Sequence, residues 1–228
     1  MTNSLRDPKV AATLKRLHAR ATADWLVFLR ALPAVLWGWL RGRSAMESAI
    51  PYLKNAYIPI NAEQGQVLYA LARAAQAKTI VEFGTSFGIS AIYLAAAARD
   101  CGGRFTGTEL EPNKVKTARE NLATAGLDAV ATVLAGDARE TLKEIAGPID
   151  FVLLDGWKEM CLPILKQLEP QLRPGAVVLC DDIKAFAKTL APYLAYVRED
   201  GGPYVSQLLP LGDGLEFSVY LGASEVRS

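Results

Sequence analysis

The sequence predicts an α/β protein built on a doubly wound, mainly parallel sheet of seven strands. From Asn61 onward, short β-branched runs alternate with helical patterns, and this alternation is typical of βαβ units. The first five runs are short and apolar, as strands buried on both faces of a parallel sheet are. Only the residues LGDG separate the last two runs and leave no room for a crossover helix, so we expect an antiparallel C-terminal hairpin.

Each element can be placed from the pattern of apolar residues. We expect strands over residues 79–83, 105–110, 129–134, 151–155 and 176–181, and the hairpin over residues 204–209 and 215–221. We expect helices over residues 62–77, 90–99, 114–125, 138–145, 160–172 and 185–197. Gly126 and Gly175 follow helical patterns, the second directly after Pro174, and we interpret both as helix stops.

The composition favours one domain that acts on a small molecule. A chain of 228 residues with 51% hydrophobic residues can bury a full core. Its 25 Lys and Arg residues nearly balance its 24 Asp and Glu residues, so we expect no binding to nucleic acid or to an anionic membrane. The three cysteines have no CxxC spacing, and we expect a reduced, cytoplasmic protein.

The N-terminal residues 1–56 are interpreted as a helical cap or oligomerisation segment, in front of a domain at residues 57–228. Residues 25–40 are apolar, but Arg30 and Pro33 interrupt them and they fall short of the ~20 apolar residues of a membrane-spanning helix. We therefore expect no transmembrane segment, and a pair of helices that covers the active site or joins a homodimer. Contact with a membrane surface is the alternative.

Glycines and acidic residues follow the first three predicted strands. A GxxxG turn at residues 84–88 lets the backbone approach a ligand, and the helix after it offers free amides to a carboxylate or phosphate. Ser86 stands where a dinucleotide-binding GxGxxG motif has glycine. Glu109 ends the second strand, where a carboxylate can accept both hydroxyls of a ribose. Asp137 and the Ala138 amide follow the third strand, where they could bind an adenine.

Three carboxylates follow the fourth and fifth predicted strands. Asp155 ends the fourth strand, and Asp181 and Asp182 end the fifth. Neighbouring parallel strands lie roughly 5 Å apart, so we expect the three side chains to converge. Adjacent residues of a strand face opposite ways, so Asp181 and Asp182 can meet at one point only if the strand turns at its tip. Either some carboxylates are protonated, or basic side chains pair with them, or a hard divalent cation such as Mg²⁺ lies among them. We favour the metal.

Several segments resemble the catechol O-methyltransferase-like class I methyltransferases, which use S-adenosylmethionine. The similarity covers residues 58–228 and is carried by VEFGTSFGIS, TELEPNKVKTARENLATAGL, AGDA, LLDGWK, LRPGAVVLCDDI and DGLEFSVYLG. It implies the methyltransferase variant of the Rossmann-like fold. It also implies that the cofactor is bound by Ile60, Glu82, Gly84, Ser90, Glu109, Leu110, Asp137, Ala138, Asp155 and Trp157.

The resemblance also implies a metal-assisted reaction. Asp155, Asp181 and Asp182 match the metal ligands of this family, although the family usually has asparagine at the third position. Lys158, in the segment LDGWK, matches the proposed general base. An ordinary lysine has a pKa of about 10.4, so a nearby cation and partial burial would have to lower it.

The resemblance and the order of the chain also suggest which residues contact the acceptor. We expect this role for Tyr57, Ile58, Lys158, Asp182 and Gln207. Gln207 stands where the family often has an acid that contacts the second acceptor hydroxyl, so a strict preference for catechols is not expected.

We therefore expect an O-methyltransferase that acts on a hydroxyl of a small, aromatic vicinal diol with the help of a divalent metal. The alternatives are a metal-independent methyltransferase of another small acceptor and a non-catalytic protein that binds S-adenosylmethionine. An NAD-dependent oxidoreductase is disfavoured, because the GxGxxG motif is missing and the acidic trio would have no role.

Overall fold

The computed structural model describes residues 2–23 and 60–222 of the 228-residue chain. The predictions about residues 25–40, including the helical cover and the homodimer, lie outside the described residues, as do Tyr57 and Ile58. Within the described ranges, no helix is long and apolar enough to cross a membrane.

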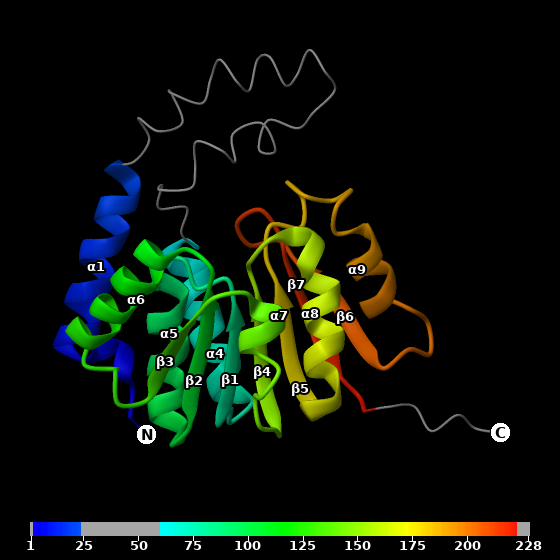
Figure 1. Ribbon diagram of the computed structural model, residues 1–228, viewed down its shortest axis with the longest axis horizontal. Coiled ribbons are helices and arrows are strands. Elements are labelled where there is room, and N and C mark those ends of the chain that lie inside the picture. The colour runs from blue at the N-terminus through cyan, green and yellow to red at the C-terminus, as the bar shows by residue number, and fades with distance from the viewer. Residues whose placement is uncertain (1, 24–59, 223–228) are drawn as a thin grey trace, which may run out of the picture.

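A seven-stranded sheet forms the centre of the protein and confirms the predicted fold class (Figure 1). Across the sheet its strands are β3 (Ala131–Ala135), β2 (Arg104–Glu109), β1 (Thr79–Phe83), β4 (Ile149–Leu154), β5 (Leu172–Cys180), β7 (Leu215–Tyr220) and β6 (Tyr204–Leu209). The first five strands of the chain are parallel, whereas β7 runs antiparallel to β5 and to β6. The strand order reverses between β1 and β4, where a doubly wound sheet opens a crevice beyond the carboxyl ends of its strands.

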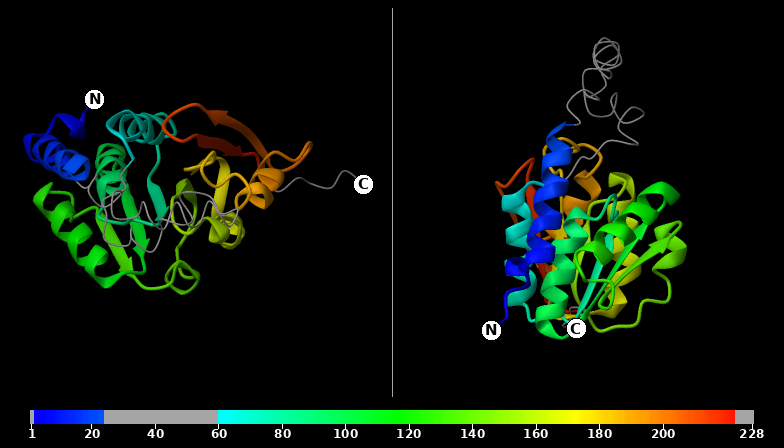
Figure 2. Two further views of the ribbon diagram at one scale, coloured as in Figure 1. Left: turned by 90° about the horizontal axis from the view of Figure 1, so that it is seen from above. Right: turned by 90° about the vertical axis from the view of Figure 1, so that its left-hand side faces the viewer.

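Helices pack against both faces of the sheet (Figure 2). The α-helices are α1 (Pro8–Ala23), α4 (Ala62–Ala74), α5 (Ile89–Cys101), α6 (Pro112–Thr124), α7 (Ala138–Thr141), α8 (Cys161–Leu168) and α9 (Ala191–Val197), and the short 3₁₀ helices are η1 (Ser4–Arg6), η2 (Lys158–Met160) and η3 (Glu169–Gln171). Residues of α1, α4, α5 and α6 form one hydrophobic cluster, and residues of α7, α8 and α9 form the other. Alternate strand residues point to opposite faces, so Ile80 joins the first cluster and Val81 the second.

Helix α1 is part of the same hydrophobic core as the sheet. Its apolar residues Val10, Leu14 and Leu17 are buried in the cluster that contains α5. Figure 2 shows α1 at the outer edge of the molecule, on the side of α5 and α6. The described part of the N-terminal region therefore packs as an integral part of the domain.

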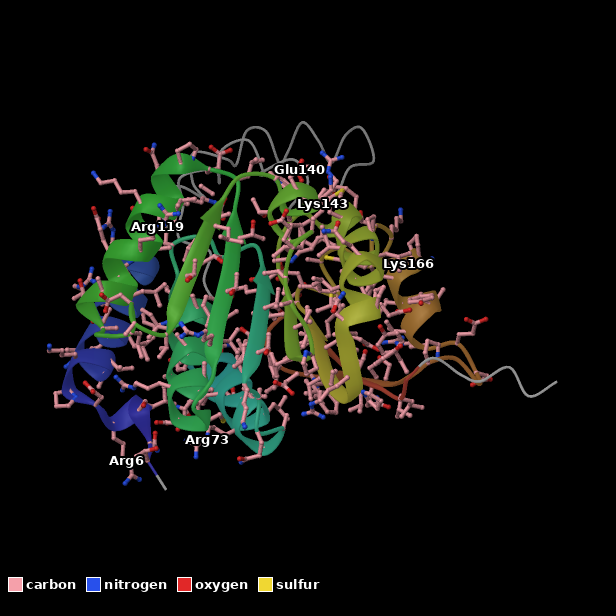
Figure 3. The ribbon with its side chains drawn as sticks, turned by 60° about the horizontal axis from the view of Figure 1, so that its bottom comes forward. Arg6, Arg73, Arg119, Glu140, Lys143 and Lys166 are labelled. Carbon is pink, nitrogen blue, oxygen red and sulfur yellow. The ribbon has the colours of Figure 1, made fainter. Side chains whose placement is uncertain are left out.

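A polar network anchors the start of the chain to α4 and α5. Asp100, at the end of α5, accepts hydrogen bonds from the Ser4 amide at 2.8 Å, the Ser4 hydroxyl at 2.6 Å and the Tyr69 hydroxyl at 2.6 Å. It also forms an ion pair of 2.9 Å with Arg73. Figure 3 shows Arg6 and Arg73 at this end of the molecule. The network satisfies the Asp100 carboxylate, whose side chain is only 2% exposed.

The fifth strand begins earlier than the sequence predicts. Strand β5 starts at Leu172, so Pro174 and Gly175 lie inside it, and the interpretation of Gly175 as a helix stop is wrong. The pairing of β4 with β5 shifts register between Ile149 and Phe151. Such an irregularity tolerates a proline and a glycine with a φ of 81° within a strand.

The last predicted helix begins later than expected, because the hairpin loop binds the backbone of the residues before it. The predicted helices over residues 138–145, 160–172 and 185–197 are observed as the shorter α7, α8 and α9. The Ile183 amide donates to the Gly214 carbonyl at 3.1 Å, and the Ala185 amide donates to the Asp213 carboxylate at 2.5 Å. These bonds hold the start of the segment against the hairpin, so α9 begins only at Ala191.

Candidate functional site: a cleft at the carboxyl edge of the sheet

The carboxyl ends of β1 to β4 open into a cleft of about 500 Å³. This volume is in the range of pockets that bind small molecules and cofactors. The predicted site residues that line the cleft are Gly84, Glu109, Leu110, Asp137, Ala138, Asp155, Trp157, Lys158 and Asp182. The cleft lies beside the β1–β4 reversal, where the topology of a doubly wound sheet predicts a ligand site.

The loop after β1 requires glycine, because it closely approaches the loop after β4. Gly84 has a φ of +94°, and a Cβ atom at this position would lie 2.5 Å from the Gly156 Cα atom. A Cβ atom on Gly156 would lie 2.4 Å from the Phe83 ring. Both values are shorter than any normal contact, so neither position can carry a side chain without a backbone shift.

Glu109 is held at the tip of β2 by two backbone amides. The Ser86 amide donates to Glu109 Oε2 at 2.8 Å, and the Glu111 amide donates to Glu109 Oε1 at 2.9 Å. A carboxylate keeps further acceptor capacity when each oxygen already has one donor. Glu109 is therefore fixed in orientation and can still accept hydroxyls of a ribose.

Two large apolar side chains of the cleft remain exposed. Leu110 is 53% exposed and Trp157 is 45% exposed, and both line the cleft. Burying such side chains normally stabilises a fold, so their exposure inside a concave site marks a binding surface. Both surfaces are of the apolar kind that a planar ring such as adenine can pack against.

Asp137 caps the short helix α7 and also pairs with Arg139. Its side chain accepts from the Arg139 amide at 2.9 Å, and its carboxylate forms an ion pair of 2.5 Å with the Arg139 guanidinium. These hydrogen bonds lower the pKa of Asp137 to about 2. The carboxylate is therefore ionised and lies at the edge of the cleft, as the predicted adenine contact requires.

Glu82 lies beneath the glycine loop, near the carboxyl end of β1. It is fully buried, and neither carboxylate oxygen has a hydrogen-bond partner among the described residues. Burial raises the pKa of Glu82 to about 8, while the neighbouring hydroxyls of Ser90 and Thr85 lower it. Glu82 and Ser90 are not among the residues that line the cleft, so they lie behind its wall.

Lys158 lies between two of the three predicted metal ligands. Its Nζ atom is 2.9 Å from Asp155 Oδ1 and 3.0 Å from Asp182 Oδ2, and its side chain is 7% exposed. Burial alone lowers the pKa of Lys158, but the two carboxylates raise it by more, to well above the usual value. In this arrangement the lysine is a protonated partner of the two acids.

Asp181 faces a different neighbour. It accepts from Gln64 Nε2, on α4, at 3.2 and 3.3 Å. Asp182 has a φ of +64°, so the chain does turn at the tip of β5. The turn nevertheless sends the two neighbouring carboxylates to separate partners.

The acidic residues have the donor chemistry of a metal site, but they are not gathered around one point. Carboxylate oxygens suit a hard divalent cation. In the described ranges, however, no group of three or more His, Cys, Asp or Glu side chains is close enough to hold a metal ion. Burial, and after it the charges of Asp155 and Asp182, raise the pKa of Asp181 to about 8.

Three further predicted site residues, Ile60, Asp181 and Gln207, are also not among the residues that line the cleft. Ile60 is 7% exposed and belongs to the hydrophobic core. Gln207 is exposed on the outer strand β6 and lines a separate pocket beside the hairpin. The structure therefore does not bring Ile60 or Gln207 to the residues that line the cleft.

Sequence analysis missed several residues that line the cleft. They include Lys114, Met160, Phe186 and Thr189. Met160 lies two residues after Lys158, so this spacing could have suggested it. Phe186 and Thr189 follow Asp182 in a segment that the sequence pattern assigns to a helix, and their position depends on the turn that replaces it.

The strand order, the antiparallel β7 and the cleft at the carboxyl edge together define the methyltransferase variant of the Rossmann-like fold. Residues 81–183 match the family model of a methyltransferase domain. The structure of the O-methyltransferase TomG from Streptomyces achromogenes in complex with SAM has 25% sequence identity and a TM-score of 0.66, over 72% of this chain and 82% of that chain.

Two curated relatives come from Mycobacterium tuberculosis. One, a catechol O-methyltransferase, is 37% identical over 127 residues, which span 55% of this chain and 57% of the relative. The other, named probable O-methyltransferase Rv1703c, is 33% identical over 165 residues, which span 66% of this chain and 68% of the relative. A catechol O-methyltransferase from Mus musculus is 30% identical over 180 residues, which span 72% of this chain and 67% of the relative. The chain therefore belongs to the catechol O-methyltransferase-like family of O-methyltransferases.

Proposed function

We propose that this protein transfers the methyl group of S-adenosylmethionine to a hydroxyl of a small, aromatic vicinal diol. The observation that carries the proposal is the composition of the cleft at the carboxyl edge of the sheet. One part offers exposed apolar surfaces and the fixed Glu109 carboxylate, which can accept hydrogen bonds from a ribose. The other part contains a buried lysine between two carboxylates. A cofactor and an acceptor bound in the two parts would meet, and methyl transfer depends mainly on such positioning.

The cofactor part of the cleft suits an adenosine group. Glu109 would accept the ribose hydroxyls, and Leu110 and Trp157 would pack against the adenine. Asp137, ionised at the edge of the cleft, would accept from the exocyclic amine, next to the Ala138 amide. The glycine loop at Gly84 would accommodate the methionine part, because its backbone is free of side chains at this point.

The acceptor part of the cleft suits a planar molecule with hydroxyl groups. Met160 and Phe186 would supply apolar walls there, and Lys158 Nζ lies 5.8 Å from the centre of the Phe186 ring. Lys158 and Asp182 would face the acceptor oxygens. The aromatic and thioether walls favour an aromatic acceptor over a sugar or a free amino acid.

A divalent cation is part of the proposal. Asp155, Asp181 and Asp182 would have to draw together to hold it, because the described structure does not gather them at one point, and it would then lower the pKa of a coordinated acceptor hydroxyl. The excess of carboxylates supports this assignment, because one lysine pairs with two acids and Asp181 has no cationic partner among the described ion pairs. With Asp155 and Asp182 committed to a cation, Lys158 would lose the two charges that raise its pKa, and burial would then lower it towards the range of a general base.

Metal-independent transfer is a second candidate, because the ion pairs of Lys158 favour it. A lysine ammonium that bridges Asp155 and Asp182 already supplies a positive charge at the acceptor end of the cleft. In this case Lys158 would orient the acceptor oxygen by donating a hydrogen bond. The two candidates differ in whether turnover needs a metal.

Transfer of a labelled methyl group from S-adenosylmethionine separates the two candidates. The acceptor panel contains vicinal aromatic diols, monophenols and amines, each with chelator and after addition of Mg²⁺. We expect transfer to the diols, a loss of at least about tenfold with chelator, and recovery with Mg²⁺. Asp155→Asn should lose activity, whereas Asp128→Asn, an exposed aspartate outside the cleft, should keep it.

Transfer that is insensitive to chelator and survives Asp155→Asn would overturn the metal site and favour the second candidate. Methylation of amines alone would overturn the hydroxyl acceptor. Binding of S-adenosylhomocysteine without any transfer across the panel would support the non-catalytic alternative instead.

Three further proposals concern the cellular compartment, the size of the acceptor and the oligomeric state. All three cysteines are free, which is compatible with a reducing cytoplasm. The nearly neutral charge favours a small acceptor over nucleic acid. Size measurement in solution would test the homodimer.

A further inference from the structure

Glu82 is a fully buried acid that the structure leaves without a partner. Its exposed fraction is 0%, and both carboxylate oxygens lack a hydrogen bond within the described part of the chain. Thr85 Oγ1, three residues further on, is 1% exposed and lacks a partner as well. Buried polar atoms are normally satisfied, so the two Glu82 oxygens point to a missing donor, and the Thr85 hydroxyl, which can donate or accept, points to a missing partner.

The surroundings of Glu82 are short of positive charge. The titratable groups that face it are Glu109, at the end of β2, and Asp155, at the end of β4, and both disfavour its ionised form. The other neighbours are the hydroxyls of Thr85 in the loop and of Ser90 at the start of α5. The positive charge closest to the reaction, Lys158, is already paired with Asp155 and Asp182. A cation that favours ionised Glu82 would therefore come from a bound group, either the cofactor or the divalent cation proposed at Asp155.

The proposed cofactor supplies such a cation. S-Adenosylmethionine carries an ammonium and a sulfonium, and its product S-adenosylhomocysteine keeps the ammonium. Gly84, two residues after Glu82, turns the backbone at the mouth of the cleft, where the methionine part is proposed to bind. The ammonium can donate hydrogen bonds to the orphaned acceptors directly or through a bound water.

We propose that Glu82 is protonated in the empty protein and ionised when the cofactor is bound, so that cofactor binding releases a proton to solvent. The proposal rests on the proposed binding of S-adenosylmethionine in this cleft and adds a pH linkage to it. The step balances as the loss of one proton from the Glu82 carboxyl group to the buffer, while the ligand ammonium compensates the new negative charge. Glu82 is thus a positioning residue whose charge follows occupancy of the site.

The size of the linkage follows from the environment of Glu82. Burial raises its pKa to about 8 in the empty protein. A group of this pKa is about nine-tenths protonated near pH 7, so full ionisation on binding would release about 0.9 proton. Because binding favours the ionised form, affinity should rise with pH, by up to about tenfold per pH unit below pH 8, and level off above it.

Calorimetric titration of S-adenosylhomocysteine into the full-length protein, with chelator present so that no divalent cation acts on Asp155, tests the linkage. At about pH 7, the dependence of the binding heat on the ionisation enthalpy of the buffer gives the number of protons released. We expect the wild type to release about 0.9 proton more than Glu82→Gln, whose side chain has the same shape and cannot ionise. The amino group of the ligand titrates equally with both proteins and cancels in the difference. Thermal unfolding of both proteins verifies that the variant is folded.

Glu216→Gln is the matched control. Glu216 is also fully buried, but it pairs with Arg198 beside the hairpin, outside the cleft. On binding S-adenosylhomocysteine, the Glu216→Gln variant should release the same number of protons as the wild type. Equal proton release by the wild type and Glu82→Gln would overturn the inference while leaving cofactor binding intact. Absence of any binding by the folded wild type would overturn the proposed function itself, and the inference with it.

Discussion

At the scale of single residues, the cofactor part of the cleft depends on apolar side chains that the fold leaves exposed. Trp157 is 45% exposed in the cleft, so its removal should leave the core intact and remove a surface for the adenine. Stacking of a base on an aromatic ring contributes about 1–3 kcal/mol, so Trp157→Ala should weaken binding of S-adenosylhomocysteine by roughly tenfold to a hundredfold. Titration calorimetry measures the affinity.

The control for this prediction is Val205→Ala. Val205 is 61% exposed on β6 and lies outside the cleft, so its truncation should not change the affinity. If Trp157→Ala bound as tightly as the wild type, the adenine could not lie against Trp157.

The sequence could predict which side chains lie at the carboxyl edge of the sheet. It could not predict which other side chains they pair with. An acid or glycine directly after an apolar run lies at the sheet edge whatever the loops do, so Glu109, Asp137 and Asp155 line the cleft as expected. The partner of Asp181 depends on the fold of the whole chain, because Gln64 reaches it from 117 residues away. The pairing of Lys158 with both Asp155 and Asp182 was one of three alternatives that spacing alone could not separate.

At the scale of elements, the close contact between the loops after β1 and β4 shapes the cleft. Gly84→Ala would place a Cβ atom 2.5 Å from the Gly156 backbone and would also strain a backbone with a φ of +94°. We expect a loss of about 3 kcal/mol in the free energy of unfolding, together with weaker cofactor binding. Chemical denaturation followed by circular dichroism measures the first effect and calorimetry the second.

Gly102→Ala separates the effect of backbone strain from the effect of a steric clash. Gly102 has a φ of +67°, but a Cβ atom there would meet nothing within 4 Å. Its substitution should cost only about 1 kcal/mol and leave binding unchanged. Similar losses for both variants would show that the contact with Gly156 is not what requires glycine at position 84.

The positions of elements that pack in the sheet core could be predicted from their apolar pattern. The positions of elements whose backbone is bound by another loop could not. The strand positions follow from β-branched runs that are buried on both faces. Residues 185–190 have a helical pattern, but the hairpin loop binds the preceding backbone through Asp213 and Gly214. Likewise, the register shift opposite β4 keeps Pro174 and Gly175 inside β5, and no local signal indicates such a shift.

At the scale of the whole molecule, the Asp100 network ties the start of the chain at Ser4, just before helix α1, to α4 and α5. Asp100 accepts three hydrogen bonds from Ser4 and Tyr69 and pairs with Arg73. Asp100→Ala would leave these donors and the arginine without their acceptor, so we expect a loss of about 3 kcal/mol in the free energy of unfolding. Urea denaturation measures it, with Asp128→Ala, an exposed aspartate, as the control.

The same denaturation shows whether α1 belongs to the cooperative unit. Because Val10, Leu14 and Leu17 share a hydrophobic cluster with α5, we expect a single transition in which helical and tertiary signals coincide. A separate early transition of the helical signal would contradict a common core.

The central claim is that one cleft brings S-adenosylmethionine and an acceptor hydroxyl together beside Lys158. The most direct test follows a labelled methyl group from S-adenosylmethionine to an aromatic vicinal diol, with Mg²⁺ present, for the wild type and for Lys158→Gln. We predict an O-methylated product with the wild type and a loss of at least about a hundredfold in kcat for the variant, with unchanged affinity for S-adenosylhomocysteine. Undiminished transfer by Lys158→Gln, or no transfer to any hydroxyl by the wild type, would contradict the claim.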